Sequence, residues 1–182
     1  MNYFTFIEIL GSVFYLLQNI SLSLEKRIGW LLGLIGAIAY FIVAIHKGSF
    51  AYSVLEVMNG IIFIFGIFVW QKYENVERKV TLTMSVLALI GIFFVFFLNL
   101  GSPNWILENL MVIVFVLGIV FLVLRNPIGW ILYILGHILL IAYAYLLGTY
   151  FILILQVVSL PFAFLGYKNF KLKKSRSLND QF

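Results

Sequence analysis

The sequence IGWLLGLIGAIAYFIVAIHKGSF at residues 28–50 recurs one hundred residues later as IGWILYILGHILLIAYAYLLGTY at residues 128–150. Without gaps, this offset gives sixteen identities between residues 7–70 and residues 107–170. Leu and Ile pairs match by chance in any apolar chain, but Gly, Trp and Glu pairs in one register do not. These pairs are Gly29/Gly129, Gly36/Gly136, Gly48/Gly148, Gly66/Gly166, Trp30/Trp130 and Glu8/Glu108. The chain therefore contains an internal repeat.

The composition places this repeat in a membrane. Of the 182 residues, 64% are hydrophobic and only 10% are charged, whereas soluble domains are roughly 45–50% apolar and about 25% charged. A soluble fold of this length could not bury so much apolar surface, and the bilayer removes the difficulty. There is no cysteine, which excludes disulfides and thiolate metal sites. The net charge of +5 is explained by loop and tail cations, so nucleic acid is not an expected partner.

Charged residues and turn formers divide the chain into seven apolar segments, each close to the length of about 20 residues that crosses a bilayer. They are residues 6–24, 29–46, 50–70, 80–99, 106–124, 128–147 and 150–167. We predict an all-α integral membrane protein in which residues 1–167 form one transmembrane domain. Repeat one covers 6–70, repeat two covers 106–170, and the helix at 80–99 links them. An odd number of crossings per unit plus one linker gives both units the same orientation, a 3+1+3 parallel pseudo-repeat.

The distribution of Lys and Arg predicts the orientation. One side of the membrane, which includes the C-terminal tail, carries eleven of these residues, and the opposite side carries Lys47 alone. We expect the protein in the cell membrane, that is, the inner or plasma membrane. The positive-inside rule then places its C-terminus in the cytoplasm and its N-terminus on the outer side. Residues 168–182 are predicted to form a basic cytoplasmic tail.

Polar residues interrupt the third and seventh predicted helices at equivalent positions. Glu56 lies about six residues into its helix, on the order of 9 Å below the outer surface, where an unpaired charge costs several kcal/mol. Tyr52 and Asn59 share its helix face, and Gln156 and Ser159 form the matching stripe. Two interpretations are open. These residues face one path and bind a ligand, or Glu56 is a protonated partner in a helix–helix hydrogen bond.

Aromatic residues and one histidine are further candidates for ligand binding. Tyr40 and Tyr133 could stack on an aromatic ligand or simply pack, and a cation near such rings gains about 0.5–2 kcal/mol. Trp30 and Trp130 suit either the site or an interfacial aromatic belt, and the belt is the favoured interpretation for Trp70 and Trp105. His137 could bind ligand, relay a proton or hydrogen-bond a neighbour. Glu8 and Glu108 could pair with the opposite repeat, surround the entrance of a ligand path, or be hydrated.

The 3+1+3 plan, together with residues 24–35, 49–71 and 130–156, resembles the PnuC-type vitamin transporters. The resemblance implies a homotrimer with a SWEET-like helix arrangement. It also implies facilitated diffusion of nicotinamide riboside into the cell, where a kinase traps it. Relatives carry thiamine, riboflavin or deoxynucleosides. We therefore expect nicotinamide riboside, or one of these similar compounds, as the substrate. A non-transporting assembly subunit and an ion- or proton-coupled carrier are the alternatives.

The sequence departs from the PnuC pattern at residues of the probable site. A Gln usual in the third helix is Glu56, and an Asn of the second helix is Gly36. In the sixth helix, where the PnuC pattern has an Asn and a Trp, this sequence has His137 and Tyr133. No catalytic signature, such as a nucleophile elbow, a P-loop or a zinc-binding helix, is present. The sequence predicts neither an enzyme nor a cofactor or metal site.

Overall fold

Seven helices make up the computed structural model of the chain, which describes residues 3–70, 78–98, 100–101 and 103–179. They are α1 (Tyr3–Ser23), α2 (Ile28–His46), α3 (Phe50–Val69), α4 (Arg78–Leu98), α5 (Trp105–Val123), α6 (Ile128–Leu146) and α7 (Tyr150–Asn179). The described residues contain no strand, which agrees with the predicted all-α class. Most of the charged stretch before α4 (residues 71–77) and the last three residues of the predicted tail (180–182) lie outside the described residues.

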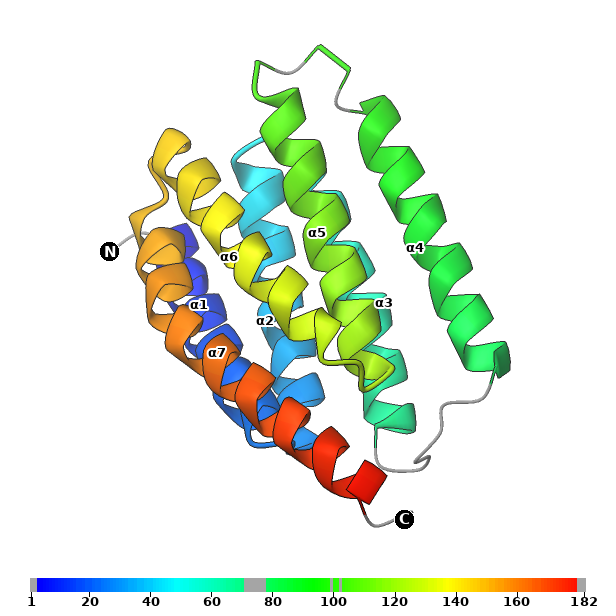
Figure 1. Cartoon of the computed structure of the whole chain (residues 1–182). Helices are drawn as coiled ribbons and strands as arrows, with labels where there is room; N and C mark the ends of the chain where they lie inside the picture. Colours follow the sequence, from blue (N-terminus) through cyan, green and yellow to red (C-terminus); the bar gives the residue numbers. More distant parts are fainter. Residues whose placement is uncertain (1–2, 71–77, 99, 102, 180–182) are drawn as a thin grey trace.

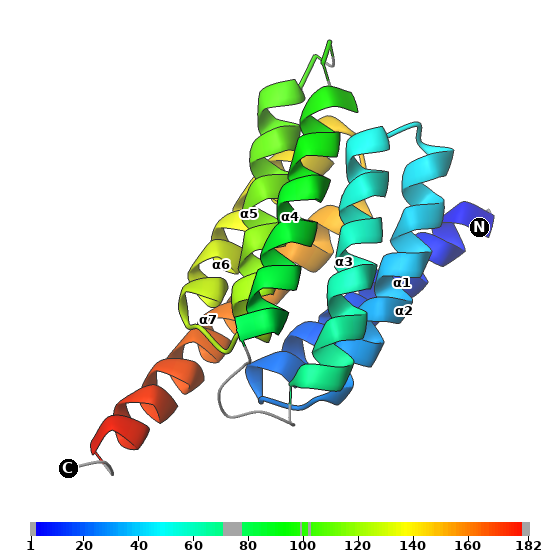
Figure 2. The same cartoon turned by 90° about the vertical axis from the view of Figure 1, so that its right-hand side faces the viewer.

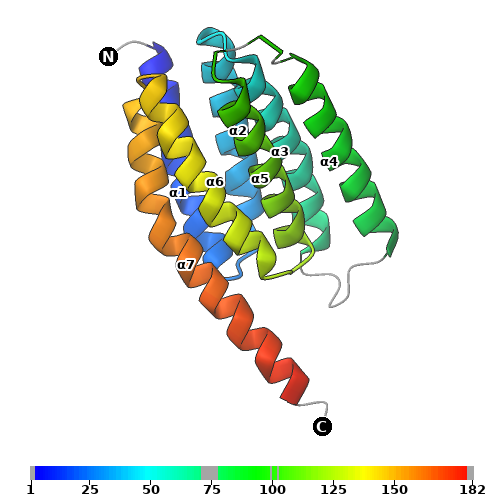
Figure 3. The same cartoon turned by 45° about the horizontal axis from the view of Figure 1, so that its top comes forward.

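The helices form two triplets, α1–α3 and α5–α7, which we call the first and second triplet. Within each triplet, consecutive helices pack against each other. The triplets meet along two seams, where α1 contacts α7 and α3 contacts α5 (Figure 1). α4 packs on the outside of the second seam, against α3 and α5, and lies at the edge of the bundle in Figure 3.

The turns of the two triplets have matching backbone geometry at the offset seen in the sequence. Glu25 and Arg125 adopt φ of 57° and 54°, and Gly48 and Gly148 adopt φ of 68° and 65°. Each lies just after a helix C-terminus, where a left-handed residue closes the last turn. The positive φ explains the two Gly residues, since this region is open to Gly at no steric cost. Positive φ does not explain why Glu and Arg occur at positions 25 and 125. Both residues adopt this conformation in the same turn of their triplets.

A tryptophan packs onto a glycine at the equivalent place in each triplet. A Cβ atom at Gly66 would lie 2.3 Å from the Trp30 ring, and one at Gly166 would lie 2.4 Å from the Trp130 ring. Both indoles have no exposed surface. The sequence repeat therefore reflects a packing constraint, because any larger residue at either glycine would displace a buried ring.

Six of the described helices are long and apolar enough to cross a membrane: α1, α2, α3, α5, α6 and α7. In α4 the stretch whose side chains the structure describes, Leu82–Phe97, is apolar as well. The helix predicted at 80–99 is therefore present as α4, and its crossing of the membrane stays a prediction.

The C-terminal helix is longer than the apolar segment from which it was predicted. α7 continues past residue 167 to Asn179 and projects beyond the bundle (Figure 2). Lys and Arg end an apolar segment but are good helix formers, so the basic residues that follow extend the helix.

Candidate functional site

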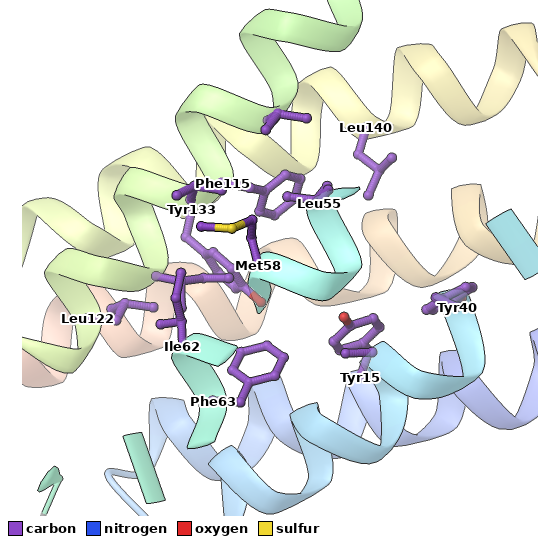
Figure 4. Close-up of a cluster of buried hydrophobic side chains, with 14 of the residues drawn as sticks. Tyr15, Tyr40, Leu55, Met58, Ile62, Phe63, Phe115, Leu122, Tyr133 and Leu140 are labelled. Atoms are coloured by element: carbon purple, nitrogen blue, oxygen red, sulfur yellow. The ribbon is translucent and has the colours of Figure 1, made fainter. Parts of the chain in front are cut away.

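A small cavity lies between the triplets. About 30 Å³ of it is open to the centre of a water molecule. Its lining comes from α1, α3, α5, α6 and α7, and α2 contributes none of the lining residues found. They are Tyr15, Asn19, Tyr52, Leu55, Glu56, Asn59, Phe115, Ile119, Tyr133, His137, Leu140, Leu155 and Gln156. Figure 4 shows part of the buried core around it, with Tyr15, Phe115 and Tyr133 reaching in from three helices.

The first triplet contributes a carboxylate to this cavity. Glu56 is 3% exposed and accepts a hydrogen bond from the Tyr15 hydroxyl. The Asn59 amide lies 3.5 Å from the same carboxylate oxygen, Oε2. Because burying a polar group without partners is costly, these two hydrogen bonds satisfy the Glu56 side chain at the cavity wall. Of the described lining residues, none is Lys or Arg.

The second triplet contributes a neutral polar and aromatic wall. The Gln156 side-chain oxygen is hydrogen-bonded to Nδ1 of His137. The ring of His137 lies 4.6 Å from that of Tyr133 and 5.6 Å from that of Phe115, centroid to centroid, in edge-on arrangements. Such geometry fixes the ring directions, so this wall presents defined aromatic surfaces beside Glu56.

Several buried polar atoms at the cavity have no hydrogen-bond partner among the described residues. They are Oδ1 of Asn19, Oδ1 of Asn59 and Nε2 of His137. Buried polar groups in folded proteins are nearly always satisfied by protein or water. These three atoms are therefore available to water or to the hydroxyl and amide groups of a ligand.

Six of the ten candidate ligand-binding residues line the cavity: Tyr52, Glu56, Asn59, Tyr133, His137 and Gln156. The other four, Tyr40, Ser159, Trp30 and Trp130, are buried but do not line it. An interfacial belt is wrong for Trp30, Trp130 and also Trp70, because at most 1% of each side chain is exposed. Trp105, at 41% exposed, remains compatible with a belt.

Tyr15, Asn19 and Phe115 line the cavity but were not among the candidates. The repeat carried a usable signal for two of them, because Tyr15 and Phe115 are equivalent at the offset of one hundred residues. Their helices, α1 and α5, are also equivalent. Asn19 is an amide within an apolar segment, which marks a residue that needs a partner.

Glu8 and Glu108 lie outside the cavity and are each 7% exposed. Glu8 pairs with Lys47 at 3.4 Å. The Tyr143 hydroxyl donates to Oε1 of Glu108 at 3.1 Å and lies 2.8 Å from the Ser49 hydroxyl. Among the residues that the structure describes, each carboxylate is thus partnered within its own triplet, and neither pairs with the opposite repeat.

Six described helices that are apolar and long enough to cross a bilayer, packed around a small polar cavity, define the class: a multi-pass membrane protein. The chain belongs to the nicotinamide mononucleotide transporter family, whose model matches residues 5–171. It is thus a transporter of that family, as the resemblance implied. The fold is shared with a crystal structure of the vitamin B3 transporter PnuC, at a TM-score of 0.76 and 19% identity, over 94% of this chain and 83% of that one. None of the curated proteins matches the sequence.

Proposed function

We propose that the chain carries nicotinamide riboside, or a closely similar nucleoside vitamin, into the cell by facilitated diffusion. The observation that carries this proposal is the cavity shared by both triplets, with one carboxylate on one wall and neutral aromatic groups on the other. A pyridinium ring fits both walls. Its charge is attracted to Glu56, and aromatic faces nearby add cation–π attraction of about 0.5–2 kcal/mol.

The lining favours a riboside over the mononucleotide in the family's name. A phosphate carries close to two negative charges and is held in proteins by Arg, Lys or helix N-termini. The described lining residues include no Lys or Arg, and Glu56 would repel a phosphate. A ribose, in contrast, needs neutral hydrogen-bonding groups, which Asn19, Asn59 and His137 offer.

The cavity volume indicates that side chains move when a ligand binds. A single water needs about 10–15 Å³ of such volume, so about 30 Å³ holds two or three waters and no nucleoside. We infer that ligand entry separates the walls, with the seams between the triplets as the place that opens. No reaction is catalysed in this scheme, and no cofactor takes part.

The remaining parts of the proposal concern the arrangement in the membrane. Matching turns and Gly–Trp contacts support a 3+1+3 parallel pseudo-repeat with seven crossings, α4 included. The bias of Lys and Arg supports an outside N-terminus and a cytoplasmic C-terminus. The homotrimer and the SWEET-like arrangement rest on the PnuC resemblance.

Uptake of labelled nicotinamide riboside into liposomes that contain the purified chain tests the proposal. We expect saturable uptake that stops when inside and outside concentrations are equal and that does not depend on a pH gradient. Empty liposomes are the control, and unlabelled thiamine, riboflavin, a deoxynucleoside and the mononucleotide serve as competitors. If thiamine competed more strongly than unlabelled riboside, thiamine would replace nicotinamide riboside as the proposed substrate. Uptake at the level of empty liposomes for every compound would favour the assembly subunit.

A further inference from the structure

The two triplets place an aromatic ring on a glycine in the same way beside the cavity. A Cβ atom at Gly36 would lie 3.1 Å from the Tyr15 ring, and one at Gly136 would lie 3.0 Å from the Phe115 ring. Tyr15 and Phe115 are equivalent in the repeat, as are the two glycines. The packing is therefore repeated, and the difference between the two rings is one hydroxyl group.

That hydroxyl has a partner that the second triplet lacks. The Tyr15 hydroxyl donates to Glu56, whereas the equivalent Gln156 is bonded to His137 instead. Phe115 has no hydroxyl to donate. A glycine, a tyrosine and a glutamate thus occur together in one triplet, and their counterparts are a glycine, a phenylalanine and a glutamine.

The Tyr15 ring is fixed on several sides, so its hydroxyl has a defined position. Besides the backbone of Gly36, it stacks on Tyr40 at 5.3 Å with an interplanar angle of 17°. It also meets Phe63 edge-on at 6.2 Å. Only 8% of Tyr15 is exposed. A donor held in this way orients a carboxylate and offsets part of the cost of burying its charge.

We propose that Tyr15 is the positioning residue that makes Glu56 select positively charged ligands. Its hydroxyl holds the carboxylate at the cavity wall, and Gly36 provides the space that lets the ring reach it. The transporter then prefers a cationic ring over a neutral ring of the same shape. The inference rests on the proposed function and adds the group that determines charge specificity.

Two forms of one compound test this proposal. Nicotinamide riboside carries a pyridinium charge, and its dihydro form has the same ribose and carboxamide without the charge. We expect the wild-type chain in liposomes to take up the cationic form in preference to the neutral one. Tyr15→Phe should reduce this preference about tenfold, the value of one hydrogen bond to a charged group, and Glu56→Gln should abolish it. In the Glu56→Gln background, Tyr15→Phe should change the preference no further, which a merely structural role would not produce.

Tyr143→Phe is the matched control, because it removes a buried tyrosine hydroxyl that donates to a carboxylate outside the cavity. Its preference should equal that of the wild type. Gly36→Ala gives a second route to the same effect, since the added methyl group displaces the Tyr15 ring while the hydroxyl remains. Elution as a single species in detergent shows which variants are folded.

The outcomes separate this inference from the proposed function. A wild-type preference that Tyr15→Phe and Gly36→Ala both leave intact would overturn the role of Tyr15 and leave the proposed function standing. A wild type that takes up both forms equally would also overturn only the inference. Uptake of neither form would overturn the proposed function, and the role of Tyr15 with it.

Discussion

α2 and α6 are equivalent in the repeat, yet they differ in what they offer to the cavity. α6 lines it with Tyr133, His137 and Leu140, where α2 has Gly33, Ala37 and Tyr40. The space at Gly33 is filled from α1, because a Cβ atom there would lie 2.8 Å from the Gln18 side chain.

In the second triplet the large and small residues change places. Gly118, the counterpart of Gln18, packs against the backbone of α6 at Tyr133. Side-chain volume is therefore exchanged between neighbouring helices while the backbone plan is kept. The two triplets therefore share their packing at the turns and at the Gly–Trp contacts, and they diverge at the cavity.

The largest expected effect tests the conserved packing. Gly66→Ala and Gly166→Ala should each lower the free energy of unfolding by about 3 kcal/mol, because a methyl group meets a rigid, buried indole. Gly60→Ala is the control on α3, since the nearest atom to its Cβ lies 3.7 Å away, an ordinary contact. Thermal unfolding in detergent measures all three. A strong effect at one glycine and none at its counterpart would mean that the two triplets are not packed alike.

The next effect tests the divergence at the carboxylate. Glu56→Gln should reduce uptake of the cationic riboside by about 10- to 100-fold, as a charge-assisted interaction is worth about 1.5–3 kcal/mol. Adding Gln156→Glu should not restore uptake, because Phe115 offers no hydroxyl to a carboxylate there. Adding Phe115→Tyr as well should restore part of it. Full recovery with Gln156→Glu alone would show that the two walls are interchangeable.

A smaller effect is expected at the neutral wall. His137→Ala copies Ala37 of the first triplet and leaves Gln156 without its partner. Loss of one buried hydrogen bond is worth about 1–3 kcal/mol, so uptake should fall by roughly tenfold. The fall should be equal for cationic and neutral forms of the riboside, since the imidazole contributes shape and hydrogen bonding. A change in the ratio of the two forms would assign His137 a role in charge selection.

The helices, and six of the residues that line the cavity, could be predicted from the sequence because apolar length and the repeat are local and periodic signals. Glu56, Asn59 and Gln156 were found as polar groups at equivalent depths, and they line the cavity. The end of α7 was misplaced, because a change from apolar to basic residues marks the edge of the bilayer and does not end a helix.

The cavity neighbours that were missed depend on which helices meet across a seam. Tyr15 reaches Glu56 across 41 residues of sequence. Its equivalence with Phe115 in the repeat marks the position, but it does not show which residue the hydroxyl contacts. Trp30 and Trp130 show the opposite case. Their position near helix ends suggested the membrane–water interface. Instead, both rings are buried in the bundle, where they pack against the glycines opposite them.

The smallest expected effect concerns the outer ends of the triplets. Lys47 pairs with Glu8, whereas the counterpart of Lys47 is Leu147, and Glu108 accepts a hydrogen bond from Tyr143 with no described Lys or Arg paired to it. Lys47→Leu therefore copies the second triplet. Since 32% of the Lys47 side chain is exposed, solvent and salt screen the pair, and such pairs contribute about 0–1 kcal/mol. The unfolding temperature should fall by only a few degrees at low salt and by less at high salt. A loss as large as that of Gly66→Ala, insensitive to salt, would mean that the ion pair holds the first triplet together and that the two outer ends are stabilised by different forces.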